Sequence, residues 1–326
     1  MTNVSDPLLF GIYPGGVTGD DSGGLATGPA DDPERIRAAL DRLRPDGGTF
    51  LVRGYISFVD ADDRREVTQA PERVERYAGD GRVLDLVAQY QSHSGDVAGY
   101  VDFVRDLVRR HGHRTATLQI TEEPNVPGNP TLDGHYPRVR EAVIEGVLAG
   151  ADEAGRQGFD HLRVGFNTTP LFGPGADFIA SLTGLGGKEF IDALGYVGLD
   201  FFPDVFQPIA PDRLHDAITG LVGMHRAERL TSAGIAPEVP LHITENGWPT
   251  GPDRTPERQA EVLETTVRAI AECRTTHNVR AYTHFALRDA DSAAPGLFHR
   301  FGLLTDDYRP KPAFDVYREV IARFGG

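Results

Sequence analysis

The stretch Pro240 to Pro249, PLHITENGWP, reads as a short apolar strand that runs directly into a carboxylate. An Asn-Gly pair, typical of turns, follows Glu245 at once, so this residue is expected at the carboxyl end of the strand. Barrel and open-sheet enzymes keep their catalytic groups at that end. A second segment, Thr117 to Asn125, repeats the pattern with Glu122 and Glu123. Two strands that each end on a glutamate supply the paired carboxylates that glycosidic bond hydrolysis needs.

Composition excludes several classes of protein. The chain has 326 residues, of which 40% are hydrophobic, and can bury a large core. A net charge of −15 argues against a nucleic-acid partner, because phosphate contacts need a basic face. The single cysteine, Cys273, excludes an intrachain disulfide framework. The start of the chain lacks a basic or apolar signal region, and no run of about 18 apolar residues suggests a membrane span. A cytoplasmic location is therefore expected by default.

Eight apolar segments alternate with helical patterns along the chain. Asp32 and Pro33 begin the first helix, a short helix is expected near 71–77, and a broken one over 178–185 and 189–193. Thr255 caps another strong helix, and the Gly-rich piece 15–28 reads as a surface loop. The expected strands are 10–13, 48–55, 83–90, 117–122, 162–167, 194–202, 241–245 and 280–287.

About eight helices at roughly 40 residues per unit predict a single (β/α)8 TIM barrel that occupies residues 1–326. No linker divides the chain. A doubly wound open sheet is the structural alternative, but such sheets usually begin with a Gly-rich phosphate turn. The segment 13–16, YPGG, is a poor version of that turn.

Two motifs resemble the clan A glycoside hydrolases, which are retaining β-glycosidases on eight-fold barrels. Segment 243–248, ITENGW, is similar to the clan's seventh-strand nucleophile motif, and 121–125, TEEPN, is similar to its fourth-strand acid/base motif. The resemblance implies Glu245 as the nucleophile and Glu123 as the acid/base. It extends to the sixth strand of the galactanase-like members and to the usual end of such barrels, through segments 198–203, 302–305 and 309–313.

The sequence departs from the clan's pattern in three ways. The clan's Asn, which holds the sugar 2-hydroxyl, is here Glu122, and an ionised carboxylate can only accept hydrogen bonds. If Glu122 faces the pocket, its charge raises one pKa of the pair with Glu123 and favours an amino or donor-rich substrate. It can equally turn outward and bind a helix. Phe201 and Phe202 replace the strand-six tyrosine that donates to the nucleophile, and His284 corresponds to the usual strand-eight tryptophan.

Further residues are candidates for substrate binding. Arg53 matches the clan arginine that keeps the nucleophile ionised, with a salt bridge elsewhere equally open. Trp248 is the only tryptophan and is expected to stack on sugar, with Tyr90, Phe202 and Phe206 as possible helpers. Asn167 and His93, at strand ends, are candidates for sugar hydroxyls or for loop capping. The full substrate-binding set is Arg53, His93, Glu122, Asn167, Phe202, Trp248 and His284.

The sequence therefore predicts a retaining glycoside hydrolase that needs no cofactor and whose partner is a carbohydrate. Neither a His-Glu-x-x-His metal motif nor a Gly-x-Ser-x-Gly elbow occurs. The alternative is a barrel that binds glycans without hydrolysing them, favoured by the lost Asn, Tyr and Trp. The sugar, its linkage, exo or endo action and the oligomeric state stay open.

Overall fold

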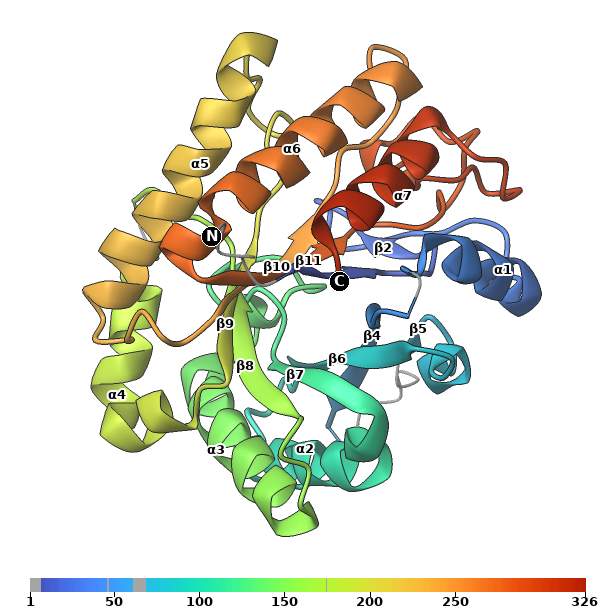
Figure 1. Cartoon of the computed structure of the whole chain (residues 1–326). Coiled ribbons are helices and arrows are strands. Elements are labelled where there is room, and N and C mark those ends of the chain that lie inside the picture. Colours follow the sequence, from blue (N-terminus) through green and yellow to red (C-terminus); the bar gives the residue numbers. More distant parts are fainter. Residues whose placement is uncertain (1–6, 46, 61–68, 174) are drawn as a thin grey trace.

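The computed structural model describes residues 7–45, 47–60, 69–173 and 175–326. Eight parallel strands follow one another around a barrel, and pairing of the first strand with the second and the last closes it (Figure 1). The predicted barrel and all eight predicted strands are confirmed. The strands are β1 (Leu9–Ile12), β4 (Phe50–Val59), β6 (Arg82–Gln91), β7 (Thr115–Ile120), β8 (Arg163–Thr168), β9 (Tyr196–Asp200), β10 (Leu241–Asn246) and β11 (Val279–His284).

Seven α-helices in the described ranges pack around the barrel (Figure 1). Asp32 caps the first through the amides of Glu34 and Arg35, and Thr255 caps the sixth, as predicted. The fourth helix is broken at Gly187, whose φ of 61° and ψ of −159° are non-helical. The helices are α1 (Pro33–Leu43), α2 (Val97–His111), α3 (Val139–Gln157), α4 (Phe178–Ala193), α5 (Leu214–Met224), α6 (Pro256–His277) and α7 (Pro312–Phe324).

The second unit departs from the expected strand–helix pattern. Between β4 and β6 the described residues form a short antiparallel strand, β5 (Gln69–Ala70), and the single 3₁₀ turn η1 (Val74–Tyr77) in place of an α-helix. Only Val74 and Tyr77 of this turn are buried, so its sequence offers too few apolar residues for a longer packed helix. The predicted segment 71–77 is therefore helical for one turn, and the expectation of about eight helices is one too many for the described chain.

The loops between these strands and helices contain shorter elements. The piece expected as a plain loop contains a two-stranded hairpin, β2 (Thr18–Gly19) with β3 (Leu25–Ala26). A π-helical segment, η5 (His225–Thr231), extends α5. The remaining 3₁₀ turns are η2 (Gly112–Arg114), η3 (Asp133–His135), η4 (Pro211–Arg213) and η6 (Leu297–His299).

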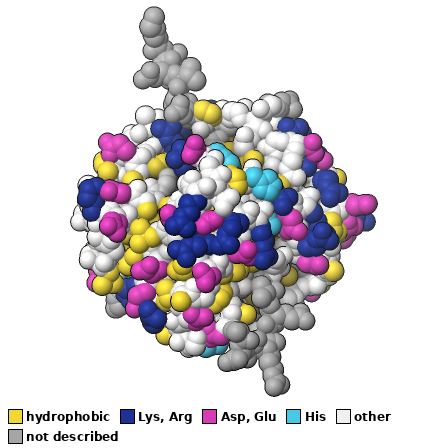
Figure 2. Space-filling model, turned by 90° about the horizontal axis from the view of Figure 1, so that it is seen from below, with side chains coloured by type: hydrophobic (Ala, Val, Ile, Leu, Met, Phe, Trp, Pro, Cys, Tyr) yellow, Lys and Arg dark blue, Asp and Glu magenta, His cyan; other side chains and the backbone are white. Residues whose placement is uncertain are grey.

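The surface carries acidic and basic side chains close to one another on the face that Figure 2 shows. In the described chain as a whole, many ion pairs join residues one helical turn apart, as in Lys188 with Asp192 and Arg156 with Asp152. Exposed pairs of this kind add little stability, because water screens them. No helix within the described ranges is long and apolar enough to cross a membrane.

Candidate active site

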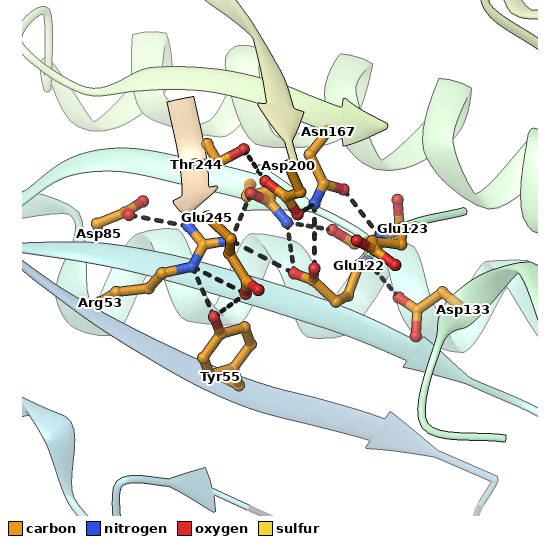
Figure 3. Close-up of polar contacts among 12 residues, drawn as sticks. Arg53, Tyr55, Asp85, Glu122, Glu123, Asp133, Asn167, Asp200, Thr244 and Glu245 are labelled. Carbon is orange, nitrogen blue, oxygen red and sulfur yellow. Dashed lines mark hydrogen bonds and ion pairs between the residues drawn. The ribbon is translucent and has the colours of Figure 1, made fainter. Parts of the chain in front are cut away.

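Glu245 lies at the carboxyl end of β10, where the strand is irregular (Figure 3). The pairing register with β9 shifts between Ile243 and Glu245, and the register with β11 shifts over the same residues. Such a bulge re-aims side chains at a sheet end. Glu245 is 8% exposed, so its carboxylate is largely withdrawn from water.

Two side chains of β4 hold the Glu245 carboxylate. Arg53 and Tyr55 are two residues apart, so they project from the same face of the strand. The Tyr55 hydroxyl donates a hydrogen bond to Glu245 Oε1, and Arg53 Nε lies 3.6 Å from that oxygen. Arg53 Nε also donates to the Tyr55 hydroxyl at 2.8 Å. Sequence reasoning missed Tyr55, which supplies the hydroxyl that Phe201 and Phe202 lack; its spacing from Arg53 was the available signal.

Arg53 is completely buried inside the barrel, and each end of its guanidinium has a protein partner. Nη1 pairs with Asp85 at 2.9 Å, while Nη2 donates to Gln119 at 2.8 Å and lies 3.4 Å from Glu122. Its position therefore fits control of the carboxylates rather than direct contact with a substrate.

Glu122 and Glu123 follow β7 in an unusual turn. Thr121 and Glu123 have φ values of 67° and 41°, which residues other than glycine rarely adopt. Two hydrogen bonds to Asp133 fix the turn. Asp133 Oδ2 accepts a hydrogen bond from the Glu122 amide at 2.8 Å, and the Asp133 amide donates one to the Glu122 carbonyl at 2.9 Å. Asn167 Oδ1 accepts from the Glu123 amide at 3.0 Å. Backbone of this kind persists only where its surroundings fix it, and it concentrates at functional sites.

The Glu122 side chain points inward, toward Asn167 and the other carboxylates, so of its two predicted orientations the structure does not have the outward one. It is 4% exposed. Gln119 Nε2 donates to one carboxylate oxygen at 2.8 Å and Asn167 Nδ2 donates to the other at 3.1 Å. The Glu123 side chain differs from it: this residue is half-buried, and the described residues provide its carboxylate with no hydrogen-bond or ion-pair partner. Glu123 is thus the carboxyl of the two that is open to a ligand.

Asp200, which sequence reasoning missed, brings a further carboxylate to the site. It ends β9, is fully buried, and accepts hydrogen bonds from Thr244 Oγ1 and Asn167 Nδ2 (Figure 3). Its place at a strand end was the available signal. Carboxylate oxygens of Glu122, Glu123 and Asp200 all lie within 4.8 Å of one another. We call Glu122, Glu123, Asp200 and Glu245 the carboxylate cluster.

Three members of the cluster could also ligate a cation. Oxygen ligands of this kind suit hard cations such as Ca²⁺ or Mg²⁺. Glu122, Glu123 and Asp200 are the one group of three in the described chain that meets the distance requirement for a metal. None of its members is a histidine, and they come from the ends of two different strands, so no short sequence motif marks the group.

Crowding and burial raise the pKa values of the cluster. Burial, with the charge of Asp200 added, raises the pKa of Glu245 to about 8, although Arg53 and the Tyr55 hydrogen bond oppose the rise. The pKa of Glu123 lies well above its usual range because of burial and the charges of Asp200 and Glu245. Glu122 and Asp200 also have raised pKa values, mainly through burial. A site of this kind retains protons near neutral pH, as general acid catalysis requires.

Three of the other candidates are engaged in contacts within the protein. Trp248 is 5% exposed, donates from its indole nitrogen to the Asp204 carbonyl and is covered by Arg254, so little of its ring is free for a sugar. His93 is exposed and packs against Tyr136, with ring centroids 5.1 Å apart. Tyr90, the possible helper, is fully buried.

At the end of β11, Phe285 rather than His284 lies toward the site. His284 is 1% exposed and packs against Tyr317 of α7. Burial lowers its pKa to about 3. The half-buried Phe285 ring instead stacks on Tyr13, with centroids 5.1 Å apart, and Tyr13 in turn contacts Tyr55. A strand alternates its faces, so one position in the sequence separates a pocket residue from a core residue.

Phe202, which follows β9, belongs to an aromatic group at the same end of the barrel. Its half-buried ring contacts Phe285, Phe301 and Phe206 at centroid distances of 6.4, 5.6 and 6.3 Å. Phe206 is 60% exposed. We call Tyr13, Phe202, Phe206, Phe285 and Phe301 the aromatic side of the mouth.

Solved structures of glycoside hydrolases have the same fold, although neither a protein-family model nor a curated protein matches the sequence. A family 39 glycoside hydrolase from Bacteroides cellulosilyticus WH2 aligns with a TM-score of 0.62 and 17% identity, over 97% of this chain and 64% of that one. A β-glucuronidase from Ruminococcus gnavus in complex with D-glucuronic acid aligns with a TM-score of 0.61 and 12% identity, over 96% of this chain and 49% of that one. A fungal β-1,4-galactanase aligns with a TM-score of 0.60 and 9% identity, over 96% of this chain and 99% of that one.

The chain spans about two thirds and one half of the first two of these structures. At 9 to 17% identity the likenesses concern the fold, and they confirm the expected resemblance to glycoside hydrolase barrels at that level.

Proposed function

We propose that this barrel is a retaining β-glycoside hydrolase in which Glu245 is the nucleophile and Glu123 the acid/base. The observation that carries the proposal is the contrast between the two glutamates, which come from the ends of β10 and β7. Glu245 is held by a phenol and a buried cation, whereas the Glu123 carboxyl is half-buried and has no partner in the described chain. A fixed carboxylate suits a nucleophile, and a partly open carboxyl with a raised pKa suits an acid.

In the first step a Glu245 oxygen attacks the anomeric carbon as the bond from this carbon to the leaving oxygen breaks. Glu123 gives its proton to the leaving oxygen, so the alcohol departs neutral and Glu123 becomes a carboxylate. The sugar is then an ester of Glu245.

In the second step Glu123 takes a proton from water, whose oxygen attacks the anomeric carbon while the ester bond to Glu245 breaks. Both glutamates return to their starting states. Two inversions at the anomeric carbon restore its β configuration, so the product would keep the configuration of the substrate.

Arg53 and Tyr55 have defined roles in this scheme. The phenol hydrogen bond and the guanidinium charge stabilise the ionised form of Glu245, against the effect of burial and of Asp200. They also fix the attacking oxygen relative to the strand, which favours a productive approach.

A panel of 4-nitrophenyl β-glycosides tests the proposal, with proton NMR of the first-formed sugar to read its anomeric configuration. We expect turnover of at least one glycoside, release of the β anomer, and loss of turnover in Glu245→Gln. Glu319→Gln, an exposed change of the same kind on α7, is the control and should keep full activity. Binding of sugars without turnover of any glycoside would instead support the glycan-binding barrel.

A further inference from the structure

The carboxylate cluster has more negative charge than its surroundings compensate. Arg53 is the cation that acts on Glu122, Asp200 and Glu245, and the charges that act on Glu123 are those of Asp200 and Glu245. Arg53 is also engaged with Asp85 at 2.9 Å and cannot approach a ligand, since it is fully buried. Buried carboxyls in this state bind protons or another cation.

The geometry restricts where on a sugar such a cation would lie. Glu245 and Glu123 must both reach the anomeric carbon, C1, in a double displacement. Of the two ring atoms bonded to C1, only C2 carries a substituent, because the other is the ring oxygen. Glu122 and Asp200 have oxygens within 4.8 Å of the Glu123 carboxylate, so Glu122 lies close to the position of a group on C2, and the charge of the buried Asp200 acts on the same position.

We infer that the sugar cleaved at this site carries a protonated amino group on C2, which Glu122 and Glu123 contact and which the charge of the fully buried Asp200 attracts. The inference rests on the proposed glycosidase activity and names its substrate class, a β-linked 2-amino-2-deoxy sugar with a free amine. The ammonium would replace protons that the cluster otherwise binds, and Glu123 contributes the free carboxyl of the set.

A sugar acid fits the charges of the site poorly. A uronic acid needs a free cation beside the ring. Arg53, the cation whose charge acts on Glu122, Asp200 and Glu245, has its donors taken by Tyr55, Asp85 and Gln119. The carboxylate of the sugar acid would also be repelled by the cluster. The structurally similar β-glucuronidase, which was solved with D-glucuronic acid, shares the fold and not this charge preference.

A metal ion fits less well than an ammonium group. Ca²⁺ and Mg²⁺ need about six oxygen ligands at roughly 2.0 to 2.6 Å. Both oxygens of Glu122 and both oxygens of Asp200 already accept hydrogen bonds, and the Asn167 amide donates between these two residues. An ammonium group forms hydrogen bonds at longer distances and leaves these donors in place.

The bound ammonium would also help the nucleophile. Burial, with the charge of Asp200 added, raises the pKa of Glu245 to about 8, and the positive charge of the ammonium opposes this rise, so it favours the ionised form of Glu245 when the correct sugar is bound. A neutral sugar lacks this effect and leaves much of Glu245 protonated near neutral pH. Substrate charge therefore bears on the chemical step as well as on binding.

The experiment compares 4-nitrophenyl β-glycosides of a 2-amino-2-deoxy sugar with the neutral sugar, the 2-acetamido sugar and the uronic acid, in the gluco and galacto series. We expect kcat/KM for the amino sugar to exceed that for its neutral counterpart by at least about 10-fold in one series. Glu122→Gln and, separately, Asp200→Asn should reduce this ratio by a similar factor. Glu319→Gln should leave it unchanged.

Each contrary outcome has a separate meaning. Equal or faster turnover of the neutral sugar in both series overturns the inference and leaves the glycosidase proposal intact. Loss of the preference on addition of EDTA assigns the cluster to a metal and also overturns it. If no glycoside is hydrolysed, the proposed function fails, and calorimetric binding of methyl β-glucosaminide against methyl β-glucoside then decides the charge preference alone.

Discussion

The carboxylate cluster and the aromatic side of the mouth hold their side chains in different ways. Hydrogen bonds fix the cluster, with Asn167 bridging Glu122, Asp200 and the Glu123 amide. The aromatic side is held by ring contacts at 5 to 6.5 Å, which tolerate small shifts. Directional polar contacts set the position of charge, whereas aromatic contacts mainly exclude water. Changes in the cluster should therefore alter the chemistry, and changes on the aromatic side should alter binding.

The largest effect is expected at the two proposed catalytic glutamates. Glu245→Ala and Glu123→Ala should each lower kcat/KM on a natural-type glycoside by at least about 10³-fold. With azide, Glu245→Ala should regain turnover and give an α-configured glycosyl azide, because the anion occupies the space of the lost carboxylate. Glu123→Ala should give the β-configured azide from a dinitrophenyl glycoside, whose leaving group needs no proton. The same anomer from both variants would show that the roles are assigned incorrectly.

A smaller effect is expected at Tyr55. Tyr55→Phe removes the hydrogen bond to Glu245 and leaves the ring contact with Tyr13 in place. We expect kcat to fall by about 10- to 100-fold, since one hydrogen bond to a charged group is worth roughly 1.5 to 3 kcal/mol. Tyr90→Phe, which removes a hydroxyl bonded to the Pro137 carbonyl, is the matched control and should keep kcat. Equal losses in both variants would indicate a general effect of a missing buried hydroxyl.

The pH dependence tests whether Asp200 sets the pKa values of the cluster. Burial is the main cause of the raised pKa values of Glu245, which is about 8, and of Glu123, and the charge of Asp200 raises both further. Since the nucleophile must be ionised, kcat/KM should rise with pH through the pKa of Glu245. Asp200→Asn should shift this limb to lower pH by about one unit. An unchanged profile with a lower Tm would make Asp200 purely structural.

Stability should respond to the same crowding. Glu245 ionises near pH 8 in the folded protein and near its ordinary value of 4.5 when unfolded, so the native state binds the extra proton between these values. The free energy of unfolding should therefore fall as pH rises from about 4.5 to 8, by at least about 1 kcal/mol from this group. In urea unfolding, Glu245→Gln should flatten this slope and be more stable than the wild type at pH 8. A steeper slope in the variant would contradict the cause assigned here.

Much of the fold follows from local sequence patterns, whereas much of the site does not. Strands and caps are local, so Asp32, Thr255 and the strand ending in Glu245 were predictable. Tyr55 and Glu245 are 190 positions apart, and barrel closure brings them together. The hydrogen-bond partners of Asp200 come from other strands in the same way. A single sequence therefore indicates where strands end, but it does not indicate which side chains of different strands contact one another.

The sequence analysis assigned the strand-eight tryptophan position to His284, whereas the Phe285 ring lies toward the site, and this difference has another cause. A slip of one position in a strand exchanges the pocket face for the core face. The pattern from Tyr282 to Ala286 contains polar and aromatic residues on both faces, so hydrophobicity alone did not fix the register. Packing of His284 against Tyr317 resolves it in the structure.

The smallest effect is expected at Phe206, the exposed end of the aromatic side. Phe206→Ala removes a ring that is 60% exposed and contacts Phe202 and Phe298, each at 6.3 Å, without touching the cluster. If this side receives part of the substrate, KM for an aryl glycoside should rise by about 3- to 10-fold, because one aromatic contact is worth roughly 0.5 to 1.5 kcal/mol. kcat should stay within about twofold, since the hydrogen bonds around Glu245 and Glu123 are unaltered. Phe172→Ala, a change at another exposed phenylalanine, should leave both constants unchanged. A fall in kcat at Phe206 would mean that the aromatic side takes part in the chemistry, and the division between the two sides would not hold.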